Sequence, residues 1–333
     1  MIHVLKPGLL TTIQDFGRYG HQKHGVIASG VMDQEAYRIA NLLVGNEQHA
    51  PVLEVTLMGP VLEFQQDVCL SICGGDLTPM VNGERVGTWK PLYIKQGSEL
   101  RFGKPKTGFR AYLAVAGGFD IPLTMNSAST YIRAGIGGHQ GRPLEKGDVL
   151  EPSDFSHLSN RVMEQLKADT GDSSFHEASW YVGHDFNHNG YTKDPIRIMP
   201  GREYDWFDEE SRGRLTSETF NIDSKSDRMG YRLTGCRLSA VEERDLLSEA
   251  VTFGTIQVPA EGNPIILLAD RQTTGGYPKI AQVASVDLPR LAQMRPGESF
   301  SFTMITHEEA QRLYLQQEKD IKLLARGIEM KLK

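Results

Sequence analysis

Four glycine-containing stretches of the chain combine backbone that can approach a bound molecule with side chains that carry charge or amide groups. They are residues 11–18, 127–142, 226–232 and 270–278. Glycine has no Cβ, so the N–H groups beside it can contact a ligand closely, while the flanking side chains supply complementary charge. The same composition is typical of tight turns in β-barrels. Each stretch is therefore a candidate site for which a purely structural role stays open.

Arginines in these stretches are candidates for binding a carboxylate or a phosphate, because a guanidinium donates two parallel hydrogen bonds to such groups. The candidates are Arg133, Arg142, Arg228 and Arg232. Arg228 and Arg232 are four residues apart, so in a strand they would lie on one face.

Groups that can transfer a proton lie in or near the same stretches. They are Asp15, Asp76, Asp227 and His139. Asp15 could instead pair with Arg18, and a single histidine in a loop is more often structural or exposed than catalytic. We predict the catalytic set Asp15, His139, Asp227 and Arg228.

The fourth stretch follows the apolar run at residues 265–269, and a buried strand that ends in amide, hydroxyl and glycine residues suits the edge of a small-molecule pocket. The alternative is a strand end with a tight turn, in which threonine and glutamine satisfy the backbone. The predicted substrate-binding residues are Arg133, Arg142, Arg232, Gln272, Thr273, Thr274, Gly275 and Gly276.

Composition excludes several classes of protein. The net charge of −6 and the absence of a basic stripe argue against a nucleic-acid partner. Three cysteines (Cys69, Cys73 and Cys236) are a poor disulfide framework and, without a second Cys or His pair, form no zinc motif, so we predict no metal. The sequence shows neither a signal peptide nor an apolar run of the roughly 18 residues that span a membrane. We therefore expect a cytoplasmic protein without membrane contact.

Three familiar motifs are only approximated. Gly103-Lys104 resembles the end of a P-loop, but Ser98 replaces its first glycine and Pro105 its Ser or Thr. Residues 135–140 fail the last position of the dinucleotide fingerprint. Met330-Lys331 resembles a biotin-attachment site but lies in a charged tail, so we predict no covalently bound cofactor.

Short apolar runs rich in β-branched or aromatic residues predict a mainly β fold of barrels or sandwiches. The runs are residues 52–57, 61–64, 68–73, 92–94, 111–115, 196–199, 265–269 and 300–305. Asn82-Gly83 between two such runs predicts a hairpin. Helices are predicted from Asp33 to Val44, at residues 153–168, from Asp287 to before Pro296, and after the capping box that begins at Thr306.

A polar Gly/Ser-containing segment at residues 169–174 is the best candidate for a linker. It predicts an N-terminal lobe at 1–168, a C-terminal lobe at 175–305 and a C-terminal helix or tail at 306–333, with exchange of segments between the lobes left open.

Long motifs in a fixed order along residues 4–305 resemble one protein family. They include residues 7–15, 17–18, 25–26, 29–33, 40–41, 43–46, 54–56, 59–60, 74–76, 112–118, 137–142, 200–201, 228–233, 248–251, 254–259 and 272–278. On these motifs the chain is identified as a member of the allophanate hydrolase subunit 2, or biotin-dependent carboxyltransferase-like, family, and it is most similar to the 5-oxoprolinase branch. The resemblance implies two cyclophilin-like β-barrel lobes with a few peripheral helices.

The resemblance also implies an activity and partners. The expected role is that of a subunit of ATP-dependent 5-oxoprolinase, which opens the lactam of 5-oxo-L-proline to L-glutamate together with subunits A and B. The B component is the kinase-inhibitor-like, subunit 1 protein. The complex uses ATP, and the sequence does not assign ATP to one of the components. Two alternatives stay open: a regulatory protein that binds and antagonises a sporulation-kinase inhibitor, and the carboxyltransferase component of a urea carboxylase or allophanate-type system.

Overall fold

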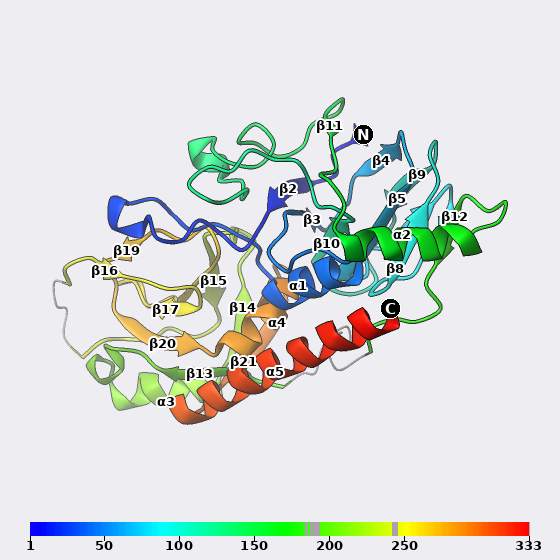
Figure 1. Ribbon diagram of the computed structural model, residues 1–333. Coiled ribbons are helices and arrows are strands. Elements are labelled where there is room, and N and C mark those ends of the chain that lie inside the picture. Colours follow the sequence, from blue (N-terminus) through cyan, green and yellow to red (C-terminus); the bar gives the residue numbers. More distant parts are fainter. Residues whose placement is uncertain (184–185, 187–193, 242–245, 333) are drawn as a thin grey trace. The chain divides into compact units, whose positions relative to one another are not determined.

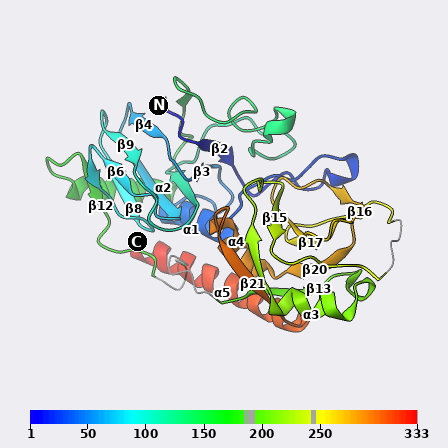
Figure 2. The same cartoon turned by 180° about the vertical axis from the view of Figure 1, so that it is seen from behind.

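The computed structural model describes residues 1–183, 186, 194–241 and 246–332, and the chain divides into two compact units. Unit 1 comprises Met1–Gly17, Asp33–Gly190 and Asp320–Lys333, and unit 2 comprises Arg18–Met32 and Tyr191–Lys319. Each unit therefore contains segments that are far apart in the sequence. Figure 1 and Figure 2 show the elements of both units.

Unit 1 contains two six-stranded sheets whose apolar faces share one core. The first sheet has the order β11 (Val149–Leu150), β1 (Ile2–Lys6), β4 (Val61–Phe64), β9 (Glu99–Phe102), β6 (Pro79–Val81) and β7 (Glu84–Arg85). The second has the order β12 (Phe175–Glu177), β8 (Pro91–Ile94), β5 (Val68–Gly74), β10 (Arg110–Val115), β3 (Val52–Thr56) and β2 (Leu10–Gln14). Alternate residues of the longer strands, such as Val68, Leu70 and Ile72 of β5, fill this core, as expected for strands with a period of two.

Strands β5 and β10 are buried on both faces because a helix covers the side that faces away from the core. This helix is α1 (Gln34–Leu43; Figure 1). Asp33 caps it by accepting from Ala36 N at 2.9 Å. The Ser71 hydroxyl of β5 donates to Ala40 O at 2.6 Å, so the covered face also makes polar contacts. Helix α2 (His157–Asp169) packs against β8, β12 and β5.

Unit 2 is built around a closed seven-stranded barrel. Its strands follow the order β13 (Ile196–Pro200), β20 (Lys279–Val283), β17 (Thr255–Gln257), β18 (Ile265–Leu267), β15 (Gly230–Thr234), β14 (Thr219–Ile222) and β21 (Ser299–Met304). Inward-facing residues such as Ile198, Ile256 and Phe302 fill the barrel. Helix α3 (Glu209–Ser217) packs against β21 (Figure 2).

The remaining elements of the described residues are short, with one exception. Helix α4 (Leu288–Gln293) has a proline in its first turn, and β16 (Glu249–Ala250) pairs with β19 (Thr274–Gly275) in a two-stranded ribbon. The exception is α5 (His307–Lys331), at whose start Thr306 Oγ1 accepts from Glu309 N at 3.1 Å. In the described part of the chain, 3₁₀ helices lie at Gln22–His24, Ile132–Ala134, Tyr204–Trp206 and Ser285–Asp287.

The mainly β prediction is confirmed, with a closed barrel in unit 2 and two further sheets in unit 1. All eight predicted strand runs overlap observed strands, and Asn82-Gly83 turns between β6 and β7. The predicted helices exist, although α2 begins at His157 because Ser156 is its N-cap. The sequence did not predict α3.

The structure divides the chain elsewhere than at residues 169–174. Strand β12, which follows that segment, pairs with β8 in unit 1, and the segment Arg18–Met32 belongs to unit 2. Within the described residues, no helix has both the length and the apolar composition needed to cross a membrane.

Candidate functional site

The predicted stretch at residues 272–276 forms one side of the two-stranded ribbon in unit 2. Gly275 pairs with Glu249 and Thr274 with Ala250, and Thr273 O accepts from Val251 N at 3.2 Å. Gln272, Thr274 and Gly276 are exposed, Thr273 is half-buried and Gly275 is buried. The ribbon thus presents polar groups and glycine backbone to solvent.

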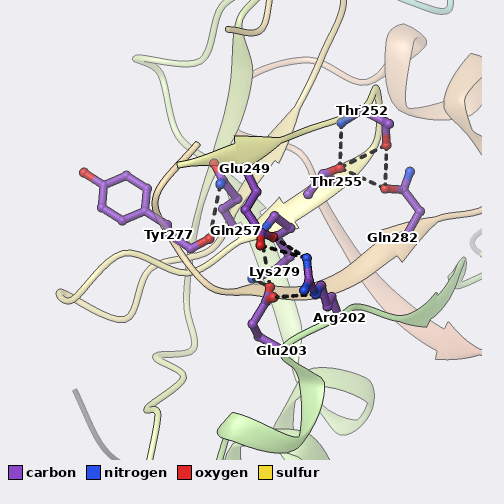
Figure 3. A network of polar contacts seen from close by, with 9 residues as sticks. All are labelled: Arg202, Glu203, Glu249, Thr252, Thr255, Gln257, Tyr277, Lys279 and Gln282. Carbon is purple, nitrogen blue, oxygen red and sulfur yellow. Dashed lines mark hydrogen bonds and ion pairs between the residues drawn. The ribbon is translucent and has the colours of Figure 1, made fainter. Parts of the chain in front are cut away.

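A buried lysine is anchored beside this ribbon by two carboxylates (Figure 3). Lys279 Nζ lies 3.3 Å from Glu203 Oε2 and 3.2 Å from Glu249 Oε2. Arg202 Nη1 donates to both carboxylate oxygens of Glu249 at 2.7 Å. These four residues, named the Lys279 cluster below, contain two cations and two anions, so their charges balance.

The backbone brings the Lys279 cluster together from separate segments of the chain. Glu203 Oε2 also accepts from the Lys279 backbone N at 3.0 Å, and Gly201 N donates to Ile280 O at 2.9 Å. A Cβ at Gly201 would overlap the Lys279 carbonyl oxygen, so glycine permits this close approach. The loop that carries Arg202 and Glu203 is therefore held directly against β20.

Electrostatics explain why this lysine tolerates burial. Only 8% of Lys279 is exposed, and a buried ammonium is costly unless carboxylates compensate it. The hydrogen bond from Lys279, together with the charge of Arg202, lowers the pKa of Glu249. The cluster therefore holds a fixed ammonium donor, with Glu249 ionised, next to the glycine backbone of the ribbon.

The amide of Gln257 joins the cluster to the predicted glycines. A register shift between Ile256 and Gln257 places Gln257 opposite Lys279, and such irregularities redirect a side chain. Gln257 Nε2 donates to Tyr277 O at 3.3 Å (Figure 3), and a Cβ at Gly275 would overlap this amide. The ribbon therefore packs closely on the Gln257 side chain at Gly275.

Arg228 takes part in a buried ion pair at a second place in unit 2. Its Nε and Nη2 lie 2.9 and 3.2 Å from the two oxygens of Asp270, and Nη2 also donates to Gly30 O at 2.5 Å. The Ser29 hydroxyl donates to Asp270 at 2.6 Å. Since Arg228, Asp270 and Ser29 are all buried, the geometry favours a structural role for Arg228.

The other predicted residues near Arg228 have different surroundings. Asp227 Oδ1 accepts from Met229 N at 2.8 Å and from Gly230 N at 3.4 Å, which stabilises the turn before β15. Arg232 is exposed on β15. The prediction that Arg228 and Arg232 share a face of one strand is wrong, because β15 begins at Gly230.

Unit 1 has a pocket of about 450 Å³ beside the predicted His139. Residues 137–141 form one wall, and Asp120, Thr124 and Glu151 contribute polar groups elsewhere. Arg142 lies just beyond the pocket-lining loop.

His139 and Arg142 converge on Asp148, which the sequence did not single out. Arg142 Nη1 and Nη2 each donate to an Asp148 oxygen at 2.8 Å, and His139 Nε2 lies 3.4 Å from Oδ1. The hydrogen bond from Arg142 is the main cause that lowers the pKa of Asp148 to about 2. Arg142 is therefore committed to an internal carboxylate.

Asp15 is enclosed by hydrogen-bond donors in unit 1. It accepts from Gly17 N at 2.9 Å, Ser127 Oγ at 2.7 Å and Ala128 N at 2.6 Å, and also from the Ser129 hydroxyl. This arrangement fixes residues 127–129 against the end of β2.

The two remaining predicted residues of unit 1 lie apart from the pocket lining. Asp76 accepts from Thr78 N at 2.9 Å and from Arg85 Nη2 at 2.6 Å, and Arg133 is exposed in the 3₁₀ helix Ile132–Ala134. Across the described part of the chain, no cluster of three or more His, Cys, Asp or Glu residues could hold a metal ion. The functional roles assigned to the individual residues from sequence stay predictions.

The sequence matches the family model of one class of protein. The family model of the carboxyltransferase domain, subdomain A and B, matches residues 24–304. The chain therefore belongs to the carboxyltransferase domain A and B family, which confirms the resemblance seen in the sequence.

Named relatives and a solved structure give a more specific comparison than the family model. The C subunit of 5-oxoprolinase from Escherichia coli (strain K12) is 37% identical over 325 residues, covering 98% of both chains. The corresponding 5-oxoprolinase protein of Haemophilus influenzae is 37% identical over 313 residues, covering 94% of both chains. The structure of the K. lactis urea amidolyase superposes with a TM-score of 0.82 at 28% identity and covers 96% of this chain, which spans 20% of that larger protein.

Proposed function

We propose that the chain is a subunit of an ATP-dependent 5-oxoprolinase that acts with subunits A and B to convert 5-oxo-L-proline to L-glutamate. The observation that carries the proposal is the 37% identity over 98% of both chains to the C subunit of a 5-oxoprolinase. The match extends over nearly the whole relative, whereas the chain spans only a fifth of the urea amidolyase. The proposed setting is a cytoplasmic complex, and the three described cysteines are free and buried.

The chemistry requires charge stabilisation. A lactam is resonance-stabilised, and phosphorylation of its oxygen by ATP makes the carbonyl carbon electrophilic. Water adds to this carbon and the ring C–N bond breaks as the nitrogen takes up a proton, which leaves an acyl phosphate. A second water hydrolyses the acyl phosphate to L-glutamate and phosphate. The phosphate group carries negative charge throughout, and preorganised donors stabilise it most effectively where water is excluded. In the proposal, Lys279 supplies such a donor and the backbone of the exposed Gly276 supplies a further N–H group. Glu203 and Glu249 hold the ammonium in place.

The test is reconstitution of the enzyme. The chain is combined with its A and B partners, and phosphate and glutamate are measured with and without 5-oxo-L-proline. Both products should form only when this chain is present. Tight binding to the B component without any turnover would reject the enzymatic role and favour the regulatory one.

A second candidate is carboxyl transfer, which the family match and the superposition on urea amidolyase favour. Carboxyl transfer from biotin would be abolished by avidin, whereas lactam cleavage would be unaffected. Lys331, the only lysine in a Met-Lys pair that suggested biotin attachment, lies in the last turn of α5, where no hairpin tip presents it. This candidate therefore places biotin on a partner.

A further inference from the structure

Arg271 is a buried cation within the predicted stretch at residues 270–278. Only 8% of it is exposed, and its Nε makes no hydrogen bond. Its Nη1 donates to Leu268 O at 3.3 Å, and the guanidinium carbon lies 5.8 Å from the centre of the Phe253 ring. The side chain is thus held in place by a carbonyl and an aromatic face.

No carboxylate of the described residues forms an ion pair with Arg271. The adjacent Asp270 is occupied, because it accepts two bonds from Arg228 and one from Ser29. A buried guanidinium usually has a carboxylate partner, since an uncompensated charge is costly to remove from water. Burial accordingly lowers the pKa of Arg271.

The position that a carboxylate would take is partly filled by a tyrosine. The Tyr19 hydroxyl hydrogen-bonds to Arg271, and 44% of Tyr19 is exposed. A neutral phenol compensates the charge poorly, and an exposed side chain can move aside. Tyr19 and Arg271 both belong to unit 2.

The other candidate arginines are less suited to bind a carboxylate. Arg142 and Arg228 are each bound through two hydrogen bonds to an aspartate, while Arg133 and Arg232 are exposed. Unlike these four arginines, Arg271 combines burial with the absence of an ion pair to a carboxylate of the described residues.

We propose that Arg271 is a binding site for a small organic carboxylate, whose oxygens replace the Tyr19 hydroxyl on the guanidinium. The site is a recognition site, and no covalent step takes place on Arg271. If the proposed function holds, on which this identification rests, the carboxylate is that of 5-oxo-L-proline. Phe253 then limits the space beside the bound group.

Two ligands that differ only in the carboxylate test the proposal directly. Binding of 5-oxo-L-proline and of 2-pyrrolidinone, the same lactam without the acid, is measured by calorimetry on the full chain and on its complex with A and B. The wild type should prefer 5-oxo-L-proline. In Arg271→Lys and Arg271→Met this preference should fall about 10- to 100-fold, the equivalent of losing hydrogen bonds to a charged group. Binding of 2-pyrrolidinone should not change.

Two further variants control for indirect effects. Arg197→Lys makes the same substitution at an arginine that Asp287 already pairs, and it should leave both affinities unchanged. Tyr19→Phe removes the hydroxyl that the ligand displaces and should retain or tighten binding of 5-oxo-L-proline. Circular dichroism establishes that each variant is folded.

The results of these binding experiments test the carboxylate site at Arg271 independently of the proposed oxoprolinase function. Folded Arg271 variants that keep the wild-type preference would overturn the carboxylate site, as would a wild type that neither prefers 5-oxo-L-proline nor binds acetate or propionate. Weaker binding of 5-oxo-L-proline to Tyr19→Phe would show that the ligand does not replace the Tyr19 hydroxyl on the guanidinium. If the complex shows no 5-oxo-L-proline-dependent ATP hydrolysis but acetate and propionate bind in an Arg271-dependent way, the carboxylate site stands and the oxoprolinase assignment fails.

Discussion

Arg228 and Asp270 meet through two hydrogen bonds, at 2.9 and 3.2 Å, with both side chains buried in unit 2. The pair joins the turn before β15 to the turn after β18. Because Arg228 also donates to Gly30 O, the same guanidinium fixes the segment Arg18–Met32 to the rest of its unit. A residue that the sequence suggested for catalysis is therefore placed to stabilise the fold.

Arg228→Met should lower the free energy of unfolding by about 3–5 kcal/mol, because it leaves the Asp270 carboxylate buried without its cation. Urea denaturation followed by fluorescence and by circular dichroism measures the change. Arg232→Met, in the exposed neighbour, is the matched control and should stay within about 0.5 kcal/mol of the wild type. Equal stability of the two variants would show that the ion pair is dispensable.

Arg271→Met should not lower the stability in the way that Arg228→Met does, although Arg271 adjoins Asp270. Removal of a buried cation without a carboxylate partner relieves desolvation, and methionine occupies a similar volume. We expect the free energy of unfolding to rise or to change by less than about 1 kcal/mol. A loss as large as that of Arg228→Met would mean that Arg271 is chiefly a structural residue.

Local sequence patterns predicted most elements but not their grouping. Asp33 before apolar residues at helical spacing predicted α1, and Asn82-Gly83 predicted the turn between β6 and β7. Helix α3 was missed because its buried residues are only Ser211 and Leu215, which gives little periodic signal. The assignment of residues 18–32 to unit 2 depends on contacts far along the chain, which single-sequence patterns do not contain.

For the candidate site, too, the sequence pattern indicated some residues but not the partners that they contact. The polar and glycine residues at 272–276 indicated a site, and they do border the Lys279 cluster. Glu203 and Lys279 were missed because they are 76 residues apart and neither belongs to a recognisable motif. Asp148 was missed because an aspartate after Lys146-Gly147 is typical of an ordinary turn.

Lys279→Met should lower kcat of the reconstituted complex by about 100-fold or more, the effect of removing a donor that stabilises developing negative charge. Phosphate release at saturating 5-oxo-L-proline measures kcat, and circular dichroism checks folding. Lys225→Met removes an exposed lysine of the same unit and should leave kcat unchanged. An unchanged kcat in folded Lys279→Met would exclude the lysine from the reaction.

Asp148 should make stability depend on pH in the acid range. Its pKa is lowered from 3.8 to about 2, chiefly by Arg142, so the folded state holds the ionised form. The contribution of ionised Asp148 to the stability of the fold is present above about pH 4 and is lost as the pH falls towards 2. For this nearly buried group the contribution is about 2 kcal/mol. Asp148→Asn should lose this amount at pH 7 and show a shallower decrease between about pH 4 and 2. Unfolding curves that stay parallel to those of the wild type would contradict the assignment.

Alanine variants of two glycines near the pocket of unit 1 distinguish the cost of backbone strain from the cost of steric overlap. Gly135 and Gly141 both have positive φ, at 63° and 71°, so alanine at either position pays a similar conformational cost. A Cβ at Gly135 would meet open space, whereas a Cβ at Gly141 would overlap the Gly135 carbonyl. Gly141→Ala should therefore be less stable than Gly135→Ala by a further 1–3 kcal/mol or so. Thermal and urea unfolding of the two variants measure this difference, and equal losses would show that the loop relaxes around the added methyl group.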